Sequence, residues 1–587
     1  MAPRRRSHAA LPGEALAPDL IIDQATIYTV DRENSTAEAV AIRDGRIAAV
    51  GASSDVRRLA GPRTHVVDLC GLTVVPGFVD GHPHMDGVGM RLLRPSFPDT
   101  SSLSAIQGRV KEEAARRAPG EWLVFNPIAD APDAFALPGR ILEARWPTRV
   151  DLDAAAPGHP VLIRAPMMVA PGVAIANSSA LERAGIGRNT RPPDGVEIDV
   201  DTHGEPTGLI WEFNFPPVIE RALFPMLPRP DHADWVRAVR AGARAFNEVG
   251  VTAIYEGHGL PAEPQAAYLD LWAQRALTVR TYFVISYPVA YYRDSRAGDA
   301  LIRETARYAA GPGFGDDLLK LGGLGFSFDS ATAIGASRMR EPYVGPRGYS
   351  WTGVQHVTDE DFETIVRKAA RAGLRVQVQC AGGRAIDSVL AIYERIDRET
   401  PLAGRRWVIE HCQFPSRYNM DACRRLGVIP TTTTNFLWCY GSIYLRSFGR
   451  ALAEDAIPLR AWLDAGLDVV QSTDGHPYSP IFTFWQSLAR RDGFTGERLT
   501  TPHQALTREQ ALRAYTIHGA RITFWEDDIG SIEVGKLADL AILSQDIMHV
   551  PEDRIPDTKV LATLLAGRAV HDTGLFASQE PYWTTRS

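Results

Sequence analysis

Short apolar runs alternate with amphipathic stretches through most of the chain. Residues 359–373 and 458–466 read as helices. Repeated strand-then-helix units with eight strands predict an α/β protein built on a parallel (β/α)8 TIM-like barrel, whose chemistry lies at the carboxyl ends of the strands. The eight runs that read as strands are 73–80, 251–256, 279–286, 318–322, 374–379, 407–411, 427–432 and 469–473.

Both ends of the chain are β-rich and differ in pattern from the middle. Near the start, two such runs surround an Arg43-Asp44-Gly45 turn, which is a hairpin signal. We predict a small composite β-sandwich formed by both ends, after a disordered tail. Residues 90–245 are too long for one crossover and predict an inserted subdomain. The predicted boundaries are 1–17 for the tail, 18–72 plus 526–575 for the sandwich, and 73–525 for the barrel with its insert.

Composition narrows the functional class. The chain has 587 residues with 63 Lys and Arg against 70 Asp and Glu, a net charge of −7, which disfavours nucleic acid as a partner. Apolar runs are too short to cross a bilayer, so no membrane association is expected. The five cysteines are scattered without a CxxC pair. Together with the lack of a signal peptide, this favours a reducing cytoplasm.

The stretch VVPGFVDGHPHMDG, residues 74–87, carries the first candidate chemistry. His82 and His84 are two residues apart, so on an extended chain both rings point to one face and can reach one ion. Two ordinary loop histidines are the competing interpretation. The pair predicts a metal site only if other strand ends supply further ligands.

Other strand ends do carry unusual residues. His411 ends an apolar strand beside Glu410, while Asp474 lies in the last strand's STDGHP ending. Lys320 lies inside an apolar strand, where an unpaired ammonium is costly. Asp474 is also consistent with a cap or turn residue. The remaining strand-end residues, which ordinary loop hydrogen bonds would equally explain, are His258, after Glu256, and His476.

Several segments together resemble the amidohydrolase superfamily, in particular its amidohydrolase-3 branch, which includes N-substituted formamide deformylases. The resemblance covers roughly residues 18–575. Its segments are PGFVDGHPH, PTRVDLDAAAPGHPV, NSSALERAGI, GEPTGLIWE, the EHCQ strand, the STD strand and GSIEVGKLADLAIL.

The resemblance implies a (β/α)8 barrel and a metal centre with the ligands His82, His84, Lys320, His411 and Asp474. It implies a divalent metal, with zinc expected, one or two per chain, and a Lys320 carboxylated by CO2. Such an ion lowers the pKa of a bound water from 15.7 to about 7 and can polarise a carbonyl. Asp474 would act as general base and then general acid, and His411 is the second catalytic candidate.

The chain departs from the family pattern at four positions. Gln379 takes the place of a ligand histidine, Gly383 that of an aspartate, Leu324 that of an acid and Gly172 that of a histidine. Amide oxygen is a weak ligand for a zinc-like ion. We therefore predict one ion on His82, His84 and Asp474, with Lys320 and His411 as further ligands or groups that orient substrate. The predicted substrate-binding residues are Gln379, His258, His476 and Trp438.

The resulting hypothesis is a metal-dependent hydrolase of an amide-type, N-acyl or cyclic amide C–N bond in a small molecule. A decarboxylase or other lyase on the same scaffold, or a silent ligand-binding relative, remain alternatives. Because Asp474 is retained, an active enzyme is favoured over a catalytically silent relative. A homodimer is an expectation of the family resemblance alone.

Overall fold

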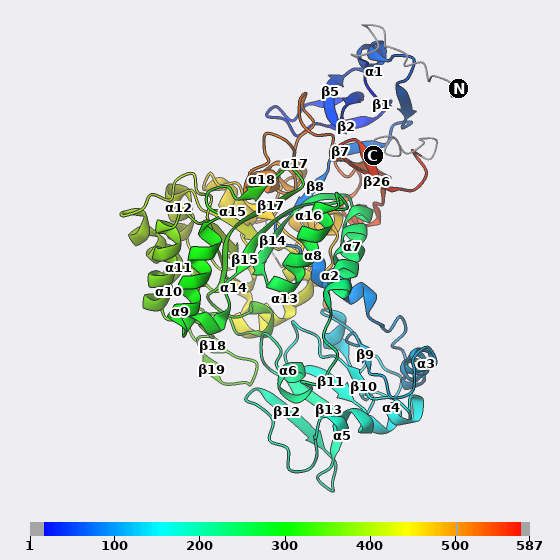
Figure 1. Ribbon diagram of the computed structural model, residues 1–587, viewed down its shortest axis with the longest axis vertical. Coiled ribbons are helices and arrows are strands. Elements are labelled where there is room, and N and C mark those ends of the chain that lie inside the picture. The colour runs from blue at the N-terminus through cyan, green and yellow to red at the C-terminus, as the bar shows by residue number, and fades with distance from the viewer. Residues whose placement is uncertain (1–16, 500–502, 577–587) are drawn as a thin grey trace, which may run out of the picture.

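A computed structural model describes residues 17–499 and 503–576 (Figure 1). Strands from both ends of the chain lie together at the top of the view. The barrel occupies the middle, and an inserted region lies below it. The predicted disordered tail, residues 1–17, lies outside the described residues except for Ala17.

The barrel sheet contains eight parallel strands, which confirms the predicted fold class, and one further short strand, β16 (Phe314–Gly315), pairs antiparallel with β17 (Leu319–Ser327). Each parallel strand pairs with the next parallel strand in chain order. The N–H of Gly81 donates to the carbonyl of Gln471 over 3.0 Å, which brings the first and last strands together. The strands are β8 (Phe78–Asp80), β14 (Val251–Leu260), β15 (Arg280–Ser286), β17 (Leu319–Ser327), β20 (Val376–Cys380), β21 (Val408–His411), β22 (Ile429–Thr432) and β23 (Val470–Gln471).

Amphipathic helices cover the outside of the barrel. In α10 (Asp359–Arg371), the Thr358 hydroxyl accepts the N–H of Asp361, and acids lie in the first turn and bases in the last. Its buried residues recur at helical spacing, so one face packs inward. The other helices after β14 are α8 (Ala262–Ala273), α9 (Ser295–Ala306), α11 (Gly383–Asp397), α12 (Arg417–Leu426), α13 (Asn435–Phe448), α14 (Arg450–Glu454), α15 (Leu459–Asp464), α16 (Pro480–Ala489), α17 (Arg508–Ala514) and α18 (Ile517–Ile522).

The composite β-region contains two sheets that share one apolar core. The first, in the order β5-β4-β1-β6, uses β5 (Arg46–Gly51), β4 (Ala39–Arg43), β1 (Leu20–Asp23) and β6 (His65–Asp68). The second, in the order β26-β25-β24-β7-β2-β3, joins both chain ends. Its strands are β26 (Arg568–Asp572), β25 (Val560–Leu565), β24 (Leu540–Leu543), β7 (Thr73–Pro76), β2 (Thr26–Tyr28) and β3 (Thr36–Ala37).

The predicted first barrel strand, 73–80, is wrong in one respect, because the structure divides it. Thr73–Pro76 pairs with β2 and β24 in the composite sheet, and only Phe78–Asp80 pairs with the barrel strand β14. The break falls at Gly77, where a Cβ atom would lie 2.2 Å from the Thr252 hydroxyl oxygen. The close approach of the Thr252 side chain therefore favours glycine where the chain changes sheets.

The insert has its own five-stranded sheet, in the order β12-β13-β11-β10-β9. It follows α2 (Met85–Leu93) and returns to the barrel through α7 (His232–Glu248). Its strands are β9 (Leu123–Phe125), β10 (Val161–Ile163), β11 (Gly172–Ala176), β12 (Val196–Val200) and β13 (Pro206–Glu212), and its helices are α3 (Leu103–Ala114), α4 (Arg149–Ala155), α5 (Ser178–Arg183) and α6 (Ile219–Leu223).

Within residues 17–499 and 503–576, every helix is too short or too polar to span a bilayer.

Candidate metal centre

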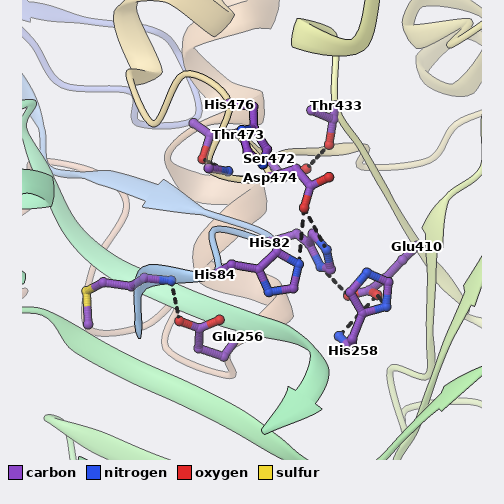
Figure 2. Close-up of polar contacts among 12 residues, drawn as sticks. His82, His84, Glu256, His258, Glu410, Thr433, Ser472, Thr473, Asp474 and His476 are labelled. Atoms are coloured by element: carbon purple, nitrogen blue, oxygen red, sulfur yellow. Dashed lines mark hydrogen bonds and ion pairs between the residues drawn. The ribbon is translucent and has the colours of Figure 1, made fainter. Parts of the chain in front are cut away.

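The carboxyl ends of the barrel strands bring five predicted residues into one cluster. Figure 2 shows four of them, and the fifth, His411, has its ring 5.2 Å from that of His82. They come from the loops after β8 and β23, from β14 and from the end of β21. The five residues, called the histidine cluster below, are His82, His84, His258, His411 and Asp474.

Four residues of the histidine cluster have left-handed backbone conformations. The φ angles are 52° for His84, 57° for His258, 66° for His411 and 53° for Asp474. Such conformations are uncommon for residues with a Cβ atom, cost on the order of 1–3 kcal/mol each, and concentrate at functional sites. The left-handed conformations at the strand ends therefore cost conformational free energy, and they direct these side chains toward the cluster.

Two carboxylates hold His82 from opposite sides of its ring. Glu410 Oε1 lies 2.7 Å from Nδ1, while Asp474 Oδ1 lies 3.3 Å from Nε2. The same Asp474 oxygen is 3.1 Å from Nε2 of His84. His82 Nε2 is buried and makes no hydrogen bond within the described chain. One ring nitrogen of His82 is therefore fixed by Glu410, and the other faces the middle of the cluster.

The cluster contains both charged and neutral groups. Burial opposes ionisation of Glu410, but His82 outweighs it and lowers the pKa of Glu410 to about 2. Burial likewise opposes ionisation of Asp474, but contacts with His82 and His84 hold its pKa well below the usual range. Burial, followed by the charge of His82, lowers the pKa of His411 to about 4. Burial opposes ionisation of His82, but Glu410 and Asp474 raise its pKa well above the ordinary value. Because divalent ions bind neutral imidazole and ionised carboxylate, binding of an ion would release a proton from His82.

Asp80 joins the two loops that carry the cluster. Its carboxylate accepts the N–H of His82 over 3.1 Å, the N–H of Thr473 over 3.1 Å and the Thr473 hydroxyl over 2.6 Å. The N–H of Asp474 also donates to the carbonyl of His82 over 2.8 Å. The backbone therefore fixes His82 and Asp474 relative to each other.

Two groups in the cluster have spacing that would hold a metal ion. One comprises His82, His84 and Asp474, as predicted, and the other His82, His258 and His411; in each, the potential ligand atoms lie within 4.8 Å of one another. The prediction assigned His258 to substrate binding. Its ring lies 4.5 Å from that of His82 between centroids, so its position is that of a candidate ligand.

Gln379 lies beside the cluster, and both its amide oxygen and its amide nitrogen make hydrogen bonds. The Ser327 hydroxyl donates to Oε1 over 2.9 Å, and Nε2 donates to Asp329 over 3.2 Å. Asp329 also accepts the N–H groups of Ala381 and Gly382, both over 2.9 Å. Gln379 lines the cavity above the cluster, as expected for a residue that contacts substrate.

Lys320 does not join the cluster, which corrects its prediction as a ligand. It lies near the amino end of β17, and its ammonium donates to the carbonyl of Phe524 over 3.1 Å. The ammonium also lies 5.0 Å from the ring centroid of Trp525. This carbonyl and ring stabilise the partly buried ammonium, so its position in the strand does not require the carboxylation that the family resemblance implies.

The other two predicted substrate residues differ in position. His476 lines the cavity, and its Nδ1 lies 3.3 Å from the Arg91 guanidinium. Trp438 is wrong as a cavity residue, because its ring packs on α16 instead, 5.4 Å from Phe482 and 5.6 Å from Trp485 between centroids. The neighbouring Phe436 faces the cavity and stacks on His411 at 5.5 Å.

A cavity of about 610 Å³ opens above the cluster between the barrel and the insert. Barrel residues form one end, including His84, His411 and Asp474. The insert and α7 supply much of the remaining wall, including Met167, Met168, Phe215 and Trp235. This is the size of an ordinary small-molecule site.

Sequence reasoning missed the roles of Glu410 and Asp80. Glu410 immediately precedes His411, and Asp80 lies two residues before His82. Both are fully buried carboxylates at the carboxyl ends of strands. Acids inside apolar strand ends were the available signal, because buried carboxylates require partners.

Comparison with known proteins agrees with this arrangement. The Amidohydrolase family matches residues 65–571. An N-substituted formamide deformylase of Arthrobacter pascens is 28% identical over 568 residues, covering 94% of this chain and 97% of that protein. Protein YtcJ of Bacillus subtilis is 25% identical over 559 residues, covering 93% and 98%.

Two solved structures share the fold. An uncharacterized metal-dependent hydrolase from Pyrococcus furiosus aligns with a TM-score of 0.68 and 21% identity, covering 90% of this chain and 99% of that one. A Pyrococcus horikoshii counterpart gives 0.69 and 22%, covering 91% and 99%. With the family match extending over most of the sequence, the chain belongs to the Amidohydrolase family and is a metal-dependent amidohydrolase.

Proposed function

We propose that the histidine cluster holds one divalent ion, with zinc expected, and that the enzyme hydrolyses an amide-type C–N bond of a small molecule. The prediction of a single ion is supported by the fact that both candidate ligand groups share His82. Both candidate ligand groups include His82, and Glu410 occupies its Nδ1. Only Nε2 remains, and one nitrogen lone pair binds one ion.

The residues present fit such an ion. His82 Nε2 is a buried polar atom without a hydrogen bond in the described chain, and it faces other imidazole and carboxylate donors. Glu410 on the opposite nitrogen fixes the ring in the manner common for metal-binding histidines. Ligands would come from His82, His84 and Asp474, with His258 and His411 beside them. On this proposal His258 lies next to the metal ligands, as a further candidate ligand, instead of contacting substrate.

The ion would supply Lewis-acid polarisation of the carbonyl and lower the pKa of a water molecule. Asp474 would handle the proton. Its Oδ1 lies against His82 and His84, whereas Oδ2 makes no hydrogen bond with the described residues. Oδ2 would take a proton from water as its oxygen bonds to the carbonyl carbon. Oδ2 would then return the proton to nitrogen as the C–N bond breaks, giving a carboxylic acid and an amine.

His411, Gln379 and His476 would orient the substrate around this centre. All three line the cavity. The His411 ring is held in place by stacking on Phe436, and Gln379 is fixed by Ser327 and Asp329. Fixed polar groups in a partly apolar cavity give orientation at low entropic cost.

The relative from Arthrobacter pascens makes N-substituted formamides the first substrate class to test. The zinc-loaded protein would be assayed with N-substituted formamides, N-acetyl amines and cyclic amides by following amine release. Amine and acid in equal amounts are expected. Release of CO2 in place of acid would instead support a lyase, and binding without turnover a silent relative.

Metal analysis tests the one-ion proposal separately from the reaction. Purified protein, loaded with zinc and desalted, should retain one equivalent per chain. Two equivalents that survive desalting would contradict the assignment of a single free nitrogen on His82.

A further inference from the structure

The far end of the cavity has an unpaired positive charge. Arg91, Arg94, Arg164 and Arg221 all line the cavity. Arg91 pairs with Asp130, and Arg164 pairs with Glu220. The guanidinium of half-buried Arg94 makes no hydrogen bond or ion pair with any residue of the described ranges.

Arg94 is charged under physiological conditions. Burial, assisted by nearby Arg164, lowers its pKa to about 10, which leaves it protonated at neutral pH. Glu220 is close enough to oppose this shift, but its carboxylate is already paired with Arg164. A partly desolvated guanidinium without a carboxylate partner is unusual, because such groups are normally paired.

The position of Arg94 relative to the histidine cluster is set by one helix. His84 immediately precedes α2 and Arg94 immediately follows it. Because an α-helix rises about 1.5 Å per residue, the two positions are separated by roughly 15 Å along its axis. The cavity wall includes residues of α2 between them, among them Val88 and Met90.

Both ends of α2 are held in place. The Glu256 carboxylate accepts the N–H of Met85 over 2.8 Å at its start. The Asn126 amide donates to the carbonyl of Arg91 over 2.8 Å near its end. In the middle, Gly89 packs so closely on α7 that a Cβ atom would lie 1.8 Å from the Ala238 carbonyl oxygen. The separation between cluster and arginine is therefore built into the fold.

We infer that Arg94 binds a carboxylate at the far end of the substrate, so that the preferred amides are N-acyl derivatives of ω-amino acids with an apolar spacer. The inference rests on the proposed amide hydrolysis. Guanidinium is suited to two-point recognition of carboxylate. The apolar side chains of Met168, Phe215 and Trp235 line the cavity and suit a hydrocarbon spacer. An α-amino acid would place its carboxylate beside the amide, too far from Arg94.

The test compares N-formyl-ε-aminocaproic acid with the analogue that carries a terminal hydroxymethyl group in place of the carboxylate. In the zinc-loaded enzyme, kcat/KM should be higher for the acid. Arg94→Gln should lower the acid-to-alcohol ratio of kcat/KM by about 10- to 100-fold, as expected for a charge-assisted hydrogen bond. Arg94→Lys should give an intermediate ratio. N-formylglycine and its alcohol analogue should show no such preference.

Arg221→Gln is the matched control, because Arg221 is an exposed arginine that lines the same cavity. The acid-to-alcohol ratio of kcat/KM in this variant should equal that of the wild type. An unchanged ratio in Arg94→Gln, or an equal fall in both variants, would overturn the assignment.

Binding of the acid is measured by calorimetry in parallel. Arg94-dependent binding without turnover would sustain the anion site and contradict the proposed hydrolysis. Turnover of both compounds without preference for the acid would support the proposed hydrolysis and contradict the anion site.

Discussion

The two ends of the barrel both bury charged side chains, but they satisfy them differently. At the amino end, Arg280 donates to Asp539 over 2.7 and 3.0 Å, and Lys320 donates to a backbone carbonyl. At the carboxyl end, buried His82 Nε2 lies 3.3 Å from Asp474 Oδ1 without a hydrogen bond in the described chain, and four cluster residues have left-handed backbones. Buried charge alone therefore does not mark a site. The carboxyl end differs because several imidazole and carboxylate groups converge there from residues with left-handed backbones.

Replacing Asp474 with Asn should produce the largest effect. Asn keeps an oxygen for the ion but cannot take the proton, so kcat should fall about 10²- to 10⁴-fold. Steady-state kinetics and zinc content would be measured together. Turnover within about threefold of the wild type, with zinc retained, would remove Asp474 as the proposed base.

Replacing Asp539 with Ala at the opposite end should affect stability instead of chemistry. It removes the buried carboxylate partner of buried Arg280, and loss of one partner of a buried pair costs about 3–5 kcal/mol of unfolding free energy. Denaturant unfolding measures this loss, and zinc content should be unchanged. Asp317→Ala is the control, because Asp317 is half-exposed and 3.5 Å from the same arginine. It should cost less than about 1 kcal/mol.

Glu410→Gln should weaken zinc binding. It removes the charge that fixes the His82 ring, and loss of such a partner typically reduces metal affinity about 10- to 100-fold. Competition with a chromophoric chelator gives the zinc Kd. Glu526→Gln at the amino end, which disturbs only the pair with Arg406, should leave the zinc Kd unchanged. Equal losses in the two variants would contradict a specific role for Glu410.

Lys320→Met should have the smallest effect. It removes one hydrogen bond and one ring contact, together worth at most about 2 kcal/mol of unfolding free energy. Zinc content and kcat should remain within about twofold of the wild type, because the side chain lies at the other end of the strand. Loss of zinc would restore Lys320 as a ligand.

Local patterns in the sequence were enough to predict the barrel and the convergence of the paired histidines with Asp474 at its carboxyl end. Period-two spacing and strand-end position are local properties, and they identify side chains that share a face or an edge. The wrong assignments came from properties that are not local. Lys320 was assigned to the metal through the family resemblance and its apolar neighbours in the strand, whereas β17 continues to Ser327 and leaves Lys320 near its amino end.

Packing between distant segments was equally hidden. Trp438 is two residues from Phe436, which lines the cavity, and its contact with Phe482 and Trp485 follows from how α13 meets α16. His258 takes a candidate ligand position only because β14 extends to Leu260, beyond the predicted end at 256. The unpaired state of Arg94 depends on insert residues far along the chain, which no local pattern reveals.

The helix α2 also has a consequence for comparing relatives. Because its nine residues separate His84 from Arg94, the distance between them is fixed by a residue count. A family member with one more helical turn at this place would hold the two groups about 5.4 Å further apart. We expect relatives of different helix length to prefer amides of different chain length. Alignments of natural sequences would then order these enzymes by the reach of their substrates before any of them is assayed.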